Sequence, residues 1–138
     1  MIKVFFDTDV VISSTISSKG AAHILLSEKK VEKYISTISI KEIHIVAKRL
    51  SIGKNNIDSV TKNCKTIKLS DSVPTIKRDF KTYVFDEDDS HIVAGAVSSK
   101  SHFLITYNLK DYNRNKIKED FKIVILTPAL FLQYVRSL

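Results

Sequence analysis

Short, continuously apolar runs alternate along this chain with segments of helical periodicity, and this alternation constrains the fold most. The apolar runs lie at residues 2–6, 33–38, 102–106 and 122–126. Runs of this length that are rich in β-branched and aromatic residues predict strands, and their lack of polar alternation predicts that both faces are covered. The sequence therefore predicts an α/β fold, a three-layer α/β/α sandwich around a mostly parallel central sheet.

Helical patterns occupy most of the sequence between these runs. Apolar spacing predicts helices over residues 20–30, 39–50, 55–66 and 86–100, with a last helix that Thr127 and Pro128 begin. Ser39 and Glu42 match a capping box, and Gly53 is expected to end that helix. Pro74 argues against a regular element within residues 67–85, and residues 107–120 are expected to form a polar loop or short helix.

Length, charge and cysteine content narrow the class of protein. A chain of 138 residues with 43% hydrophobic content predicts one domain over residues 1–138. The lone Cys64, the lack of a signal-peptide pattern and the lack of a membrane-spanning apolar run predict a cytoplasmic protein. The formal charge of +7 favours a polyanionic partner, of which nucleic acid is the commonest.

Acidic residues follow the ends of successive predicted strands. Asp7 and Asp9 come after the first strand, Glu42 after the second, an acidic run opens the helix before the third, and Asn108 and Asp111 follow the third. Ligands of a parallel α/β sheet bind at this edge, and converging carboxylates repel one another unless a cation neutralises them. An oxygen-only set favours Mg²⁺ or Mn²⁺, and a basic protein with such a pocket suggests phosphodiester hydrolysis by metal-activated water.

Each acid also has a purely structural interpretation. Glu42 could be only the capping partner of Ser39, and the run at residues 86–89 could only cap a helix. Asp7 and Asp9 could be turn residues, Asp111 a solvated loop residue, and His91 a packing residue. Their joint position after successive strands favours a functional site.

The ordered motifs resemble the PIN domain, the metal-dependent nuclease fold of VapC-type toxins, over nearly the whole chain. The stretches that carry the resemblance are "VFFDTDVVIS", "ISTISIKEI", "DDSHIVAGAV", "LITYNLKDY" and "IVILTPALFL". They place the family's acids at Asp7, Glu42, Asp89 and Asp111, with Thr106 and Asn108 beside the last. The sequence departs from the family at Asp9, where Asn is usual, and at Gly95, where a helix would ordinarily carry Ala.

This resemblance implies an endoribonuclease that requires Mg²⁺ or Mn²⁺. Asp7, Glu42 and Asp89 would hold the metal, Asp111 would assist through water, and Thr106 and Asn108 would orient the site, with Asp9 in support. RNA contacts are expected from four residues of one segment, Lys110, Tyr112, Arg114 and Lys116. A homodimer and a separate antitoxin protein are the implied partners.

Two alternatives stay open at this point. The "DTDVV" stretch also fits a haloacid-dehalogenase-like phosphatase, with Asp7 as nucleophile and Asp9 as acid and base. In that family, however, the Thr or Ser strand precedes the distal acidic pair, whereas here Thr106 follows the acidic run. The second alternative is a non-catalytic PIN module that only binds RNA or protein.

Overall fold

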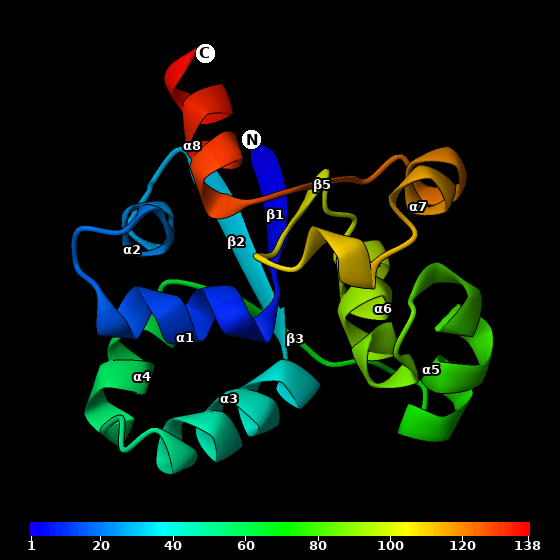
Figure 1. Ribbon diagram of the computed structural model, residues 1–138, viewed down its shortest axis with the longest axis horizontal. Helices are drawn as coiled ribbons and strands as arrows, with labels where there is room; N and C mark the ends of the chain where they lie inside the picture. Colours follow the sequence, from blue (N-terminus) through cyan, green and yellow to red (C-terminus); the bar gives the residue numbers. More distant parts are fainter.

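A five-stranded parallel sheet lies at the centre of the computed structural model, which describes residues 1–138 (Figure 1). The strand order is β3-β2-β1-β4-β5, and every neighbouring pair is parallel. The strands are β1 (Ile2–Phe6), β2 (Val31–Ser36), β3 (Lys65–Ile67), β4 (Phe103–Ile105) and β5 (Val124–Leu126). The predicted three-layer α/β/α architecture is confirmed.

Helices cover both faces of the sheet. Those that pack beside one face are α1 (Thr8–Ile16), α2 (Ala21–Leu26), α3 (Thr37–Arg49), α4 (Lys54–Thr61) and α8 (Pro128–Arg136). The opposite layer contains α5 (Val73–Phe80), α6 (Ser90–Ser98) and α7 (Arg114–Phe121). Three short 3₁₀ helices complete the chain: η1 (Lys81–Tyr83), η2 (Glu87–Asp89) and η3 (Leu109–Asp111). None of the helices combines the length and the apolarity needed to cross a bilayer.

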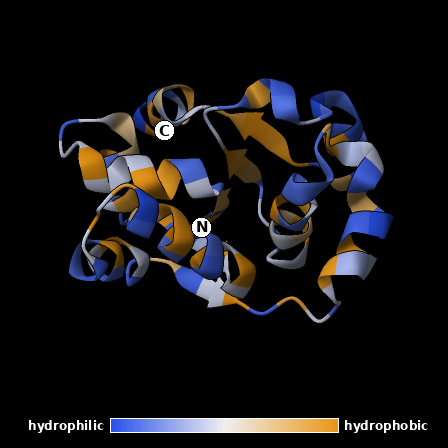
Figure 2. Ribbon diagram, turned by 60° about the horizontal axis from the view of Figure 1, so that its bottom comes forward, coloured by the Kyte–Doolittle hydropathy of each residue, from blue (hydrophilic) through white to orange (hydrophobic).

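The central strand β1 divides its side chains between two hydrophobic cores. Val4 and Phe6 belong to the core beside α1 and α8, whereas Phe5 belongs to the core beside α6. All three side chains are fully buried, as expected for a strand covered on both faces. Hydrophobic residues accordingly concentrate in the strands and on the inner faces of the helices (Figure 2).

The chain changes direction across the sheet at β1. The elements after β1 build outward through β2 and β3, and the chain then returns on the other side to add β4 and β5. The backbone N–H of Asp7 donates to the carbonyl of Ile105 at 3.0 Å, which joins the carboxyl ends of β1 and β4. In doubly wound sheets, the crevice for a ligand lies at such a switch point.

Two local predictions are wrong. Ser36, not Ser39, begins α3, because its side chain accepts the N–H of Ser39 at 3.0 Å. Helix α3 ends at Arg49. Two residues later, Ser51 has a positive φ of 58° and forms the left-handed turn that was expected at Gly53. Gly53 instead precedes the first residue of α4.

Three regular elements were missed, the first of which is α1, whose buried Val10, Val11 and Ile12 form a continuous apolar run with no helical spacing. Pro74 lies in the first turn of α5, where its missing N–H has no intrahelical partner to lose. Strand β3 is a three-residue edge strand with two exposed residues, so it has no apolar run to reveal it. Predicted and observed boundaries of the other strands differ by one or two residues.

Gly95 allows α6 to lie directly on the sheet. A Cβ atom at this position would lie 2.3 Å from Cζ of Phe5, a distance that no side-chain carbon tolerates. The glycine thus sets the depth at which α6 packs on β1. This placement matters because Asp89, the residue before α6, is a predicted site residue.

Candidate active site

A cleft of about 680 Å³ opens at the carboxyl ends of β1 and β4. Five carboxylates line it, and they come from separate parts of the chain: Asp7, Asp9, Glu42, Asp89 and Asp111. Asn108 lines the same cleft, while the predicted Thr106 lies behind it, fully buried. The structure therefore brings together the acidic residues that the sequence placed after successive strands.

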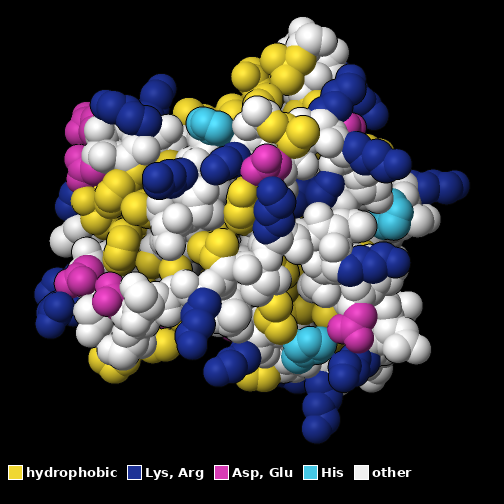
Figure 3. Space-filling model, turned by 180° about the vertical axis from the view of Figure 1, so that it is seen from behind, with side chains coloured by type: hydrophobic (Ala, Val, Ile, Leu, Met, Phe, Trp, Pro, Cys, Tyr) yellow, Lys and Arg dark blue, Asp and Glu magenta, His cyan; other side chains and the backbone are white.

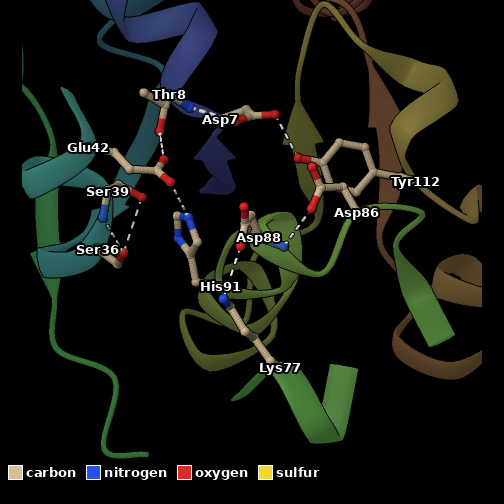
Figure 4. A network of polar contacts seen from close by, with 10 residues as sticks. All are labelled: Asp7, Thr8, Ser36, Ser39, Glu42, Lys77, Asp86, Asp88, His91 and Tyr112. Carbon is tan, nitrogen blue, oxygen red and sulfur yellow. Dashed lines mark hydrogen bonds and ion pairs between the residues drawn. The ribbon is translucent and has the colours of Figure 1, made fainter. Parts of the chain in front are cut away.

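Asp7 is held by three donors from three segments. It begins α1, and its Oδ1 accepts the backbone N–H of Thr8 at 2.7 Å. Its Oδ2 accepts the hydroxyl of Thr106 at 2.9 Å and that of Tyr112 at 2.6 Å, the second of which is drawn in Figure 4. Burial nevertheless outweighs these hydrogen bonds and raises the pKa of Asp7 above its ordinary value. The ionised form of Asp7 is therefore disfavoured in the buried site, and a nearby cation would stabilise it.

Asp9 has one satisfied and one unsatisfied oxygen. Its Oδ2 accepts the backbone N–H of Tyr107 and the side-chain amide of Asn108, each at 3.1 Å. Its Oδ1 is buried and has no hydrogen-bond partner. Burial and the charge of Asp7 raise the pKa of Asp9 to about 7. A buried carboxylate oxygen without a donor is costly unless it meets a cation or a proton.

Glu42 is oriented by one residue from α1 and one from α6. The hydroxyl of Thr8 donates to Oε1 at 2.6 Å, and Nε2 of His91 lies 2.9 Å from Oε2 (Figure 4). Burial raises the pKa of Glu42, but the hydrogen bonds from His91 and Thr8 outweigh burial, and the net pKa is lowered. Since Ser36 begins the helix, Glu42 is not the capping partner of Ser39 and remains available to the cleft.

The acidic run before α6 divides into structural and cleft-facing members. The side chain of Asp86 caps η2 by accepting the N–H of Asp88 at 3.0 Å, and Asp88 pairs with Lys77 at 2.9 Å. Asp89 makes no capping hydrogen bond and faces the cleft. Burial, followed by the charges of Asp7 and Asp111, raises the pKa of Asp89 to about 7.

Four of the five cleft carboxylates have no ion-pair partner, and only Glu42 lies against a histidine. None of the four ion pairs in the molecule involves Asp7, Asp9, Asp89 or Asp111. The acids are also not yet arranged so that three of them could coordinate one metal ion together. Protein donors instead occupy the oxygens of Asp7 and Glu42, while Oδ1 of Asp9 is left without a partner.

The four residues predicted to contact RNA have different surroundings. Lys110 is exposed on η3, whereas Nζ of Lys116 donates to Thr82 and lies over the ring of Tyr83. Arg114 lines a separate pocket beside β5. Tyr112 is only 3% exposed, so the prediction that its ring stacks on a base is wrong; its hydroxyl holds Asp7 instead.

Sequence reasoning missed the roles of three residues at the site. Thr8 and Tyr112 are ordinary residues in their local segments, and only the tertiary contacts show that they hold Glu42 and Asp7. His91 was expected only to pack; it is 6% exposed, but its Nε2 contacts Glu42 and its Nδ1 has no partner. A histidine two residues after a candidate acid was the available signal, and it was weak.

The outer half of the cleft is apolar. Ile12 and Ile16 from α1 and Ile45 and Val46 from α3 line it, and Arg49 lies at the same end. Ile16 and Ile45 are both exposed, although isoleucine is normally buried. The cleft therefore joins an acidic floor to an exposed apolar groove between two helices.

Three solved structures share this fold. VapBC2 from Rickettsia felis, bound to a DNA fragment from its promoter, superposes with a TM-score of 0.67 at 14% identity, over 91% of this chain and 98% of that one. A toxin–antitoxin complex from Klebsiella pneumoniae gives 0.62 at 20% identity, over 91% and 97%. PAE2754 from Pyrobaculum aerophilum gives 0.65 at 14% identity, over 99% and 97%.

Sequence comparison identifies the family. None of the curated protein sequences compared with the chain matches it. A family model described as the PIN domain matches residues 3–110, which include Asp7, Glu42, Asp89 and Asn108. This range covers most of the chain and four of the five strands. The chain belongs to the PIN domain family.

Proposed function

We propose that this protein is a divalent-metal-dependent endoribonuclease. The observation that carries the proposal is the convergence of five carboxylates on one cleft, four of which have no ion-pair partner. Carboxylates packed in this way raise one another's pKa, and a bound divalent ion removes that repulsion. PIN domains are typically nucleases, which agrees with this chemistry.

The donor set fits a hard cation. All the cleft-lining acids offer oxygen, and Oδ1 of Asp9 is buried without a hydrogen-bond donor. Oxygen donors favour Mg²⁺ or Mn²⁺. Asp7, Glu42 and Asp89 would hold the ion, and Asp111 would assist through water. When bound, the ion would lower the pKa of water and stabilise negative charge on the leaving oxygen.

The surrounding residues position these acids. Thr106 and Tyr112 fix Asp7, while Thr8 and His91 fix Glu42, so neither carboxylate can turn away from the cleft without losing two hydrogen bonds. Asn108 fixes Asp9 from the opposite side. Hydrogen bonds that orient metal ligands in this way typically contribute about 10- to 100-fold to metal affinity or activity.

The charge distribution supports an RNA substrate. The net charge is +7 although the site itself is acidic, so the excess positive charge lies outside the cleft. Lysine and arginine side chains are spread over the face seen in Figure 3, and acidic side chains are fewer there. A surface of this kind attracts the phosphate backbone without reading a sequence.

We further propose that the protein is the toxin of a toxin–antitoxin pair and forms a homodimer. Fold similarity to two toxin–antitoxin complexes supports the proposed antitoxin partner. The exposed apolar groove between α1 and α3 offers a segment of such a partner a surface beside the acids. An apolar side chain seated there would exclude RNA from the cleft.

The family match counts against the phosphatase alternative. The PIN model includes the Asp7–Asp9 pair on which that alternative depended. A phosphatase would need Asp9 as its acid and base and would have no role for Glu42. The non-catalytic alternative has no observation in its favour, because none of the predicted acids is missing from the cleft.

Cleavage of RNA by the purified chain tests the proposal. We expect Mn²⁺-dependent cleavage of single-stranded RNA that excess EDTA and Asp7→Asn each abolish, because both remove the charge balance of the cleft. Asp58→Asn, on the exposed surface of α4, is the matched control and should cleave like the unmodified protein. Cleavage that persists in EDTA, or in Asp7→Asn, would contradict the mechanism.

A second substitution separates the nuclease from the phosphatase. Glu42→Gln should reduce RNA cleavage roughly 100-fold or more, beyond the 10- to 100-fold typical of residues that only orient a metal ligand. A phosphatase would tolerate this change. Hydrolysis of a phosphate monoester that Glu42→Gln leaves intact and Asp9→Asn abolishes would therefore replace the proposal.

A further inference from the structure

A second pocket, of about 400 Å³, lies between β5 and the start of α7, at the edge of the sheet. Figure 1 shows α7 beside this edge strand, away from α1 and α3. Its lining is unlike that of the acidic cleft, because it contains no carboxylate. The lining residues are Phe85, Tyr112, Asn113, Arg114, Asn115, Lys118, Ile123, Val124 and Ile125.

Phe85 is the most unusual side chain of this pocket. It is 75% exposed, more than any other aromatic residue of the chain. Its backbone is nevertheless fixed, because its N–H donates to the carbonyl of Asp111 at 3.0 Å and Val84 forms a β-bridge with Tyr112. The ring is thus presented to solvent by a rigid support, an arrangement that suits a planar partner.

The polar lining has the charge and the chemistry for a nucleotide. Arg114 and Lys118 are four residues apart on α7, so they share one helix face beside the pocket. Asn113 caps α7 through its Oδ1, which accepts the N–H of Lys116, so its amide nitrogen remains free to donate. Arg114 and Lys118 can bind a phosphate, and the amides of Asn113 and Asn115 can hydrogen-bond to the edge of a base. The exposed ring of Phe85 can stack on the face of that base.

The pocket lies close to the acidic cleft. Tyr112 lines the pocket, and its hydroxyl donates to Asp7 at 2.6 Å. One side chain therefore separates the two sites. The backbone N–H of Phe85 also donates a hydrogen bond to the backbone carbonyl of Asp111, whose side chain lines the cleft. A flexible strand that crosses the cleft could place a neighbouring nucleotide in this pocket.

We propose that this pocket binds an unpaired base of the RNA strand whose phosphodiester lies in the acidic cleft. Phe85 stacks on the base, and Arg114 and Lys118 hold the adjoining phosphate. The inference rests on the proposed function and adds to it a reason for single-stranded substrates, because a paired base cannot expose its face to Phe85. The pocket selects unpaired RNA through stacking, not through a base sequence.

Binding of a short fluorescein-labelled single-stranded RNA in EDTA, measured by anisotropy, tests this role without cleavage. Phe85→Ala should weaken binding about 5- to 150-fold, the range for loss of one base–aromatic stack. Binding of the same RNA annealed into a duplex should not change. Leu138→Ala, a similarly exposed residue outside the pocket at 70% exposure, is the matched control and should leave both affinities unchanged.

A tryptophan substitution gives a second measurement that does not depend on loss of binding. Because the chain contains no tryptophan, emission from Phe85→Trp reports on this pocket alone. We expect affinity for the single-stranded RNA to be kept or improved, and the emission to be quenched as RNA is added. Leu138→Trp should show no such quenching.

The outcomes separate this inference from the proposed function. If the unmodified protein cleaves RNA with Mn²⁺ but Phe85→Ala binds single strands within twofold of it, the pocket is not a base site and the nuclease proposal stands. An equal loss of duplex and single-strand binding would also overturn the stacking role. If the unmodified protein neither binds nor cleaves RNA, the proposed function itself fails.

Discussion

Single residues in this protein have two kinds of role around the acids. Asp7 and Glu42 face the cleft, while Tyr112, Thr106, Thr8 and His91 hold those two carboxylates by hydrogen bonds. Removing a holding residue leaves the acid in place but frees its rotation. The effect on metal affinity should therefore exceed the effect on folding.

Tyr112→Phe distinguishes a holding role from the base-stacking role predicted for this tyrosine. The ring and its packing are kept, and only the hydroxyl bound to Asp7 is lost. We expect apparent Mn²⁺ affinity to fall about 10- to 100-fold, measured by calorimetry on the folded protein. A phenylalanine would stack on a base as well as tyrosine, so unchanged Mn²⁺ binding and cleavage would contradict the holding role.

Most of the acids could be located from sequence because three of them follow a strand and Asp89 opens the helix before β4, and the strands were recognisable from their apolar runs. Asp7, Glu42, Asp89 and Asp111 line the cleft as that reasoning required. Of the holding residues, only Thr106 was predicted to orient the site; the role of Tyr112 could not be located, because it lies 105 positions from Asp7 and no local pattern links the two. Contacts of that kind exist only once the sheet order is known.

At the scale of elements, the missed features share a cause. Ser36, Thr37 and Ser39 all offer a capping hydroxyl, and the extent of β2, not the local motif, decides which residue begins α3. Pro74 was interpreted as a breaker, but in the first turn of a helix it is well tolerated. Local propensity limits which residues can begin a helix, and tertiary packing decides which of them does.

The contact between α6 and β1 can be tested at Gly95. In most helices Gly→Ala stabilises by roughly 1 kcal/mol. Here the added methyl would collide with Phe5, so we expect Gly95→Ala to lower the free energy of unfolding by about 1–3 kcal/mol, measured in urea. In a Phe5→Leu background the same change should cost less. A stabilised single variant would show that α6 does not lie this close to the sheet.

At the scale of the whole molecule, charge is distributed unevenly. A protein with a net charge of +7 concentrates five of its fifteen acidic side chains around one cleft. Folding must bring these like charges together, which opposes stability unless a proton or a cation compensates. The metal-free protein should therefore respond to pH in the direction opposite to a protein whose carboxylates are salt-bridged.

The sign follows from Asp9 and Asp89, whose pKa values are both raised to about 7. Between about pH 4 and pH 7 the folded state binds more protons than the unfolded state, so stability falls as pH rises through this range. In EDTA, we expect the melting temperature to be higher near pH 5.5 than near pH 7.5 by roughly 2–5 °C, about 1 kcal/mol for a chain of this size.

Two comparisons by differential scanning calorimetry check this attribution. The double variant Asp9→Asn and Asp89→Asn should lose most of the pH difference, because neither amide titrates. Added Mn²⁺ should raise the melting temperature of the unmodified protein more near pH 7.5 than near pH 5.5, since a metal binds the ionised acids. A double variant that keeps the full pH difference would assign it to other groups.

The position of β1 between β2 and β4 has a consequence for the order of events during synthesis. Thr106 and Asp7 are 99 residues apart, yet they share a hydrogen bond, and Asp7 reaches Ile105 through its backbone. A ribosome-bound chain that stops before β4 carries Asp7, Glu42 and Asp89 but lacks Thr106 and Tyr112, two of the three donors to Asp7. Under the proposed function, the capacity to cleave RNA would therefore arise late in translation, after most of the sequence has emerged.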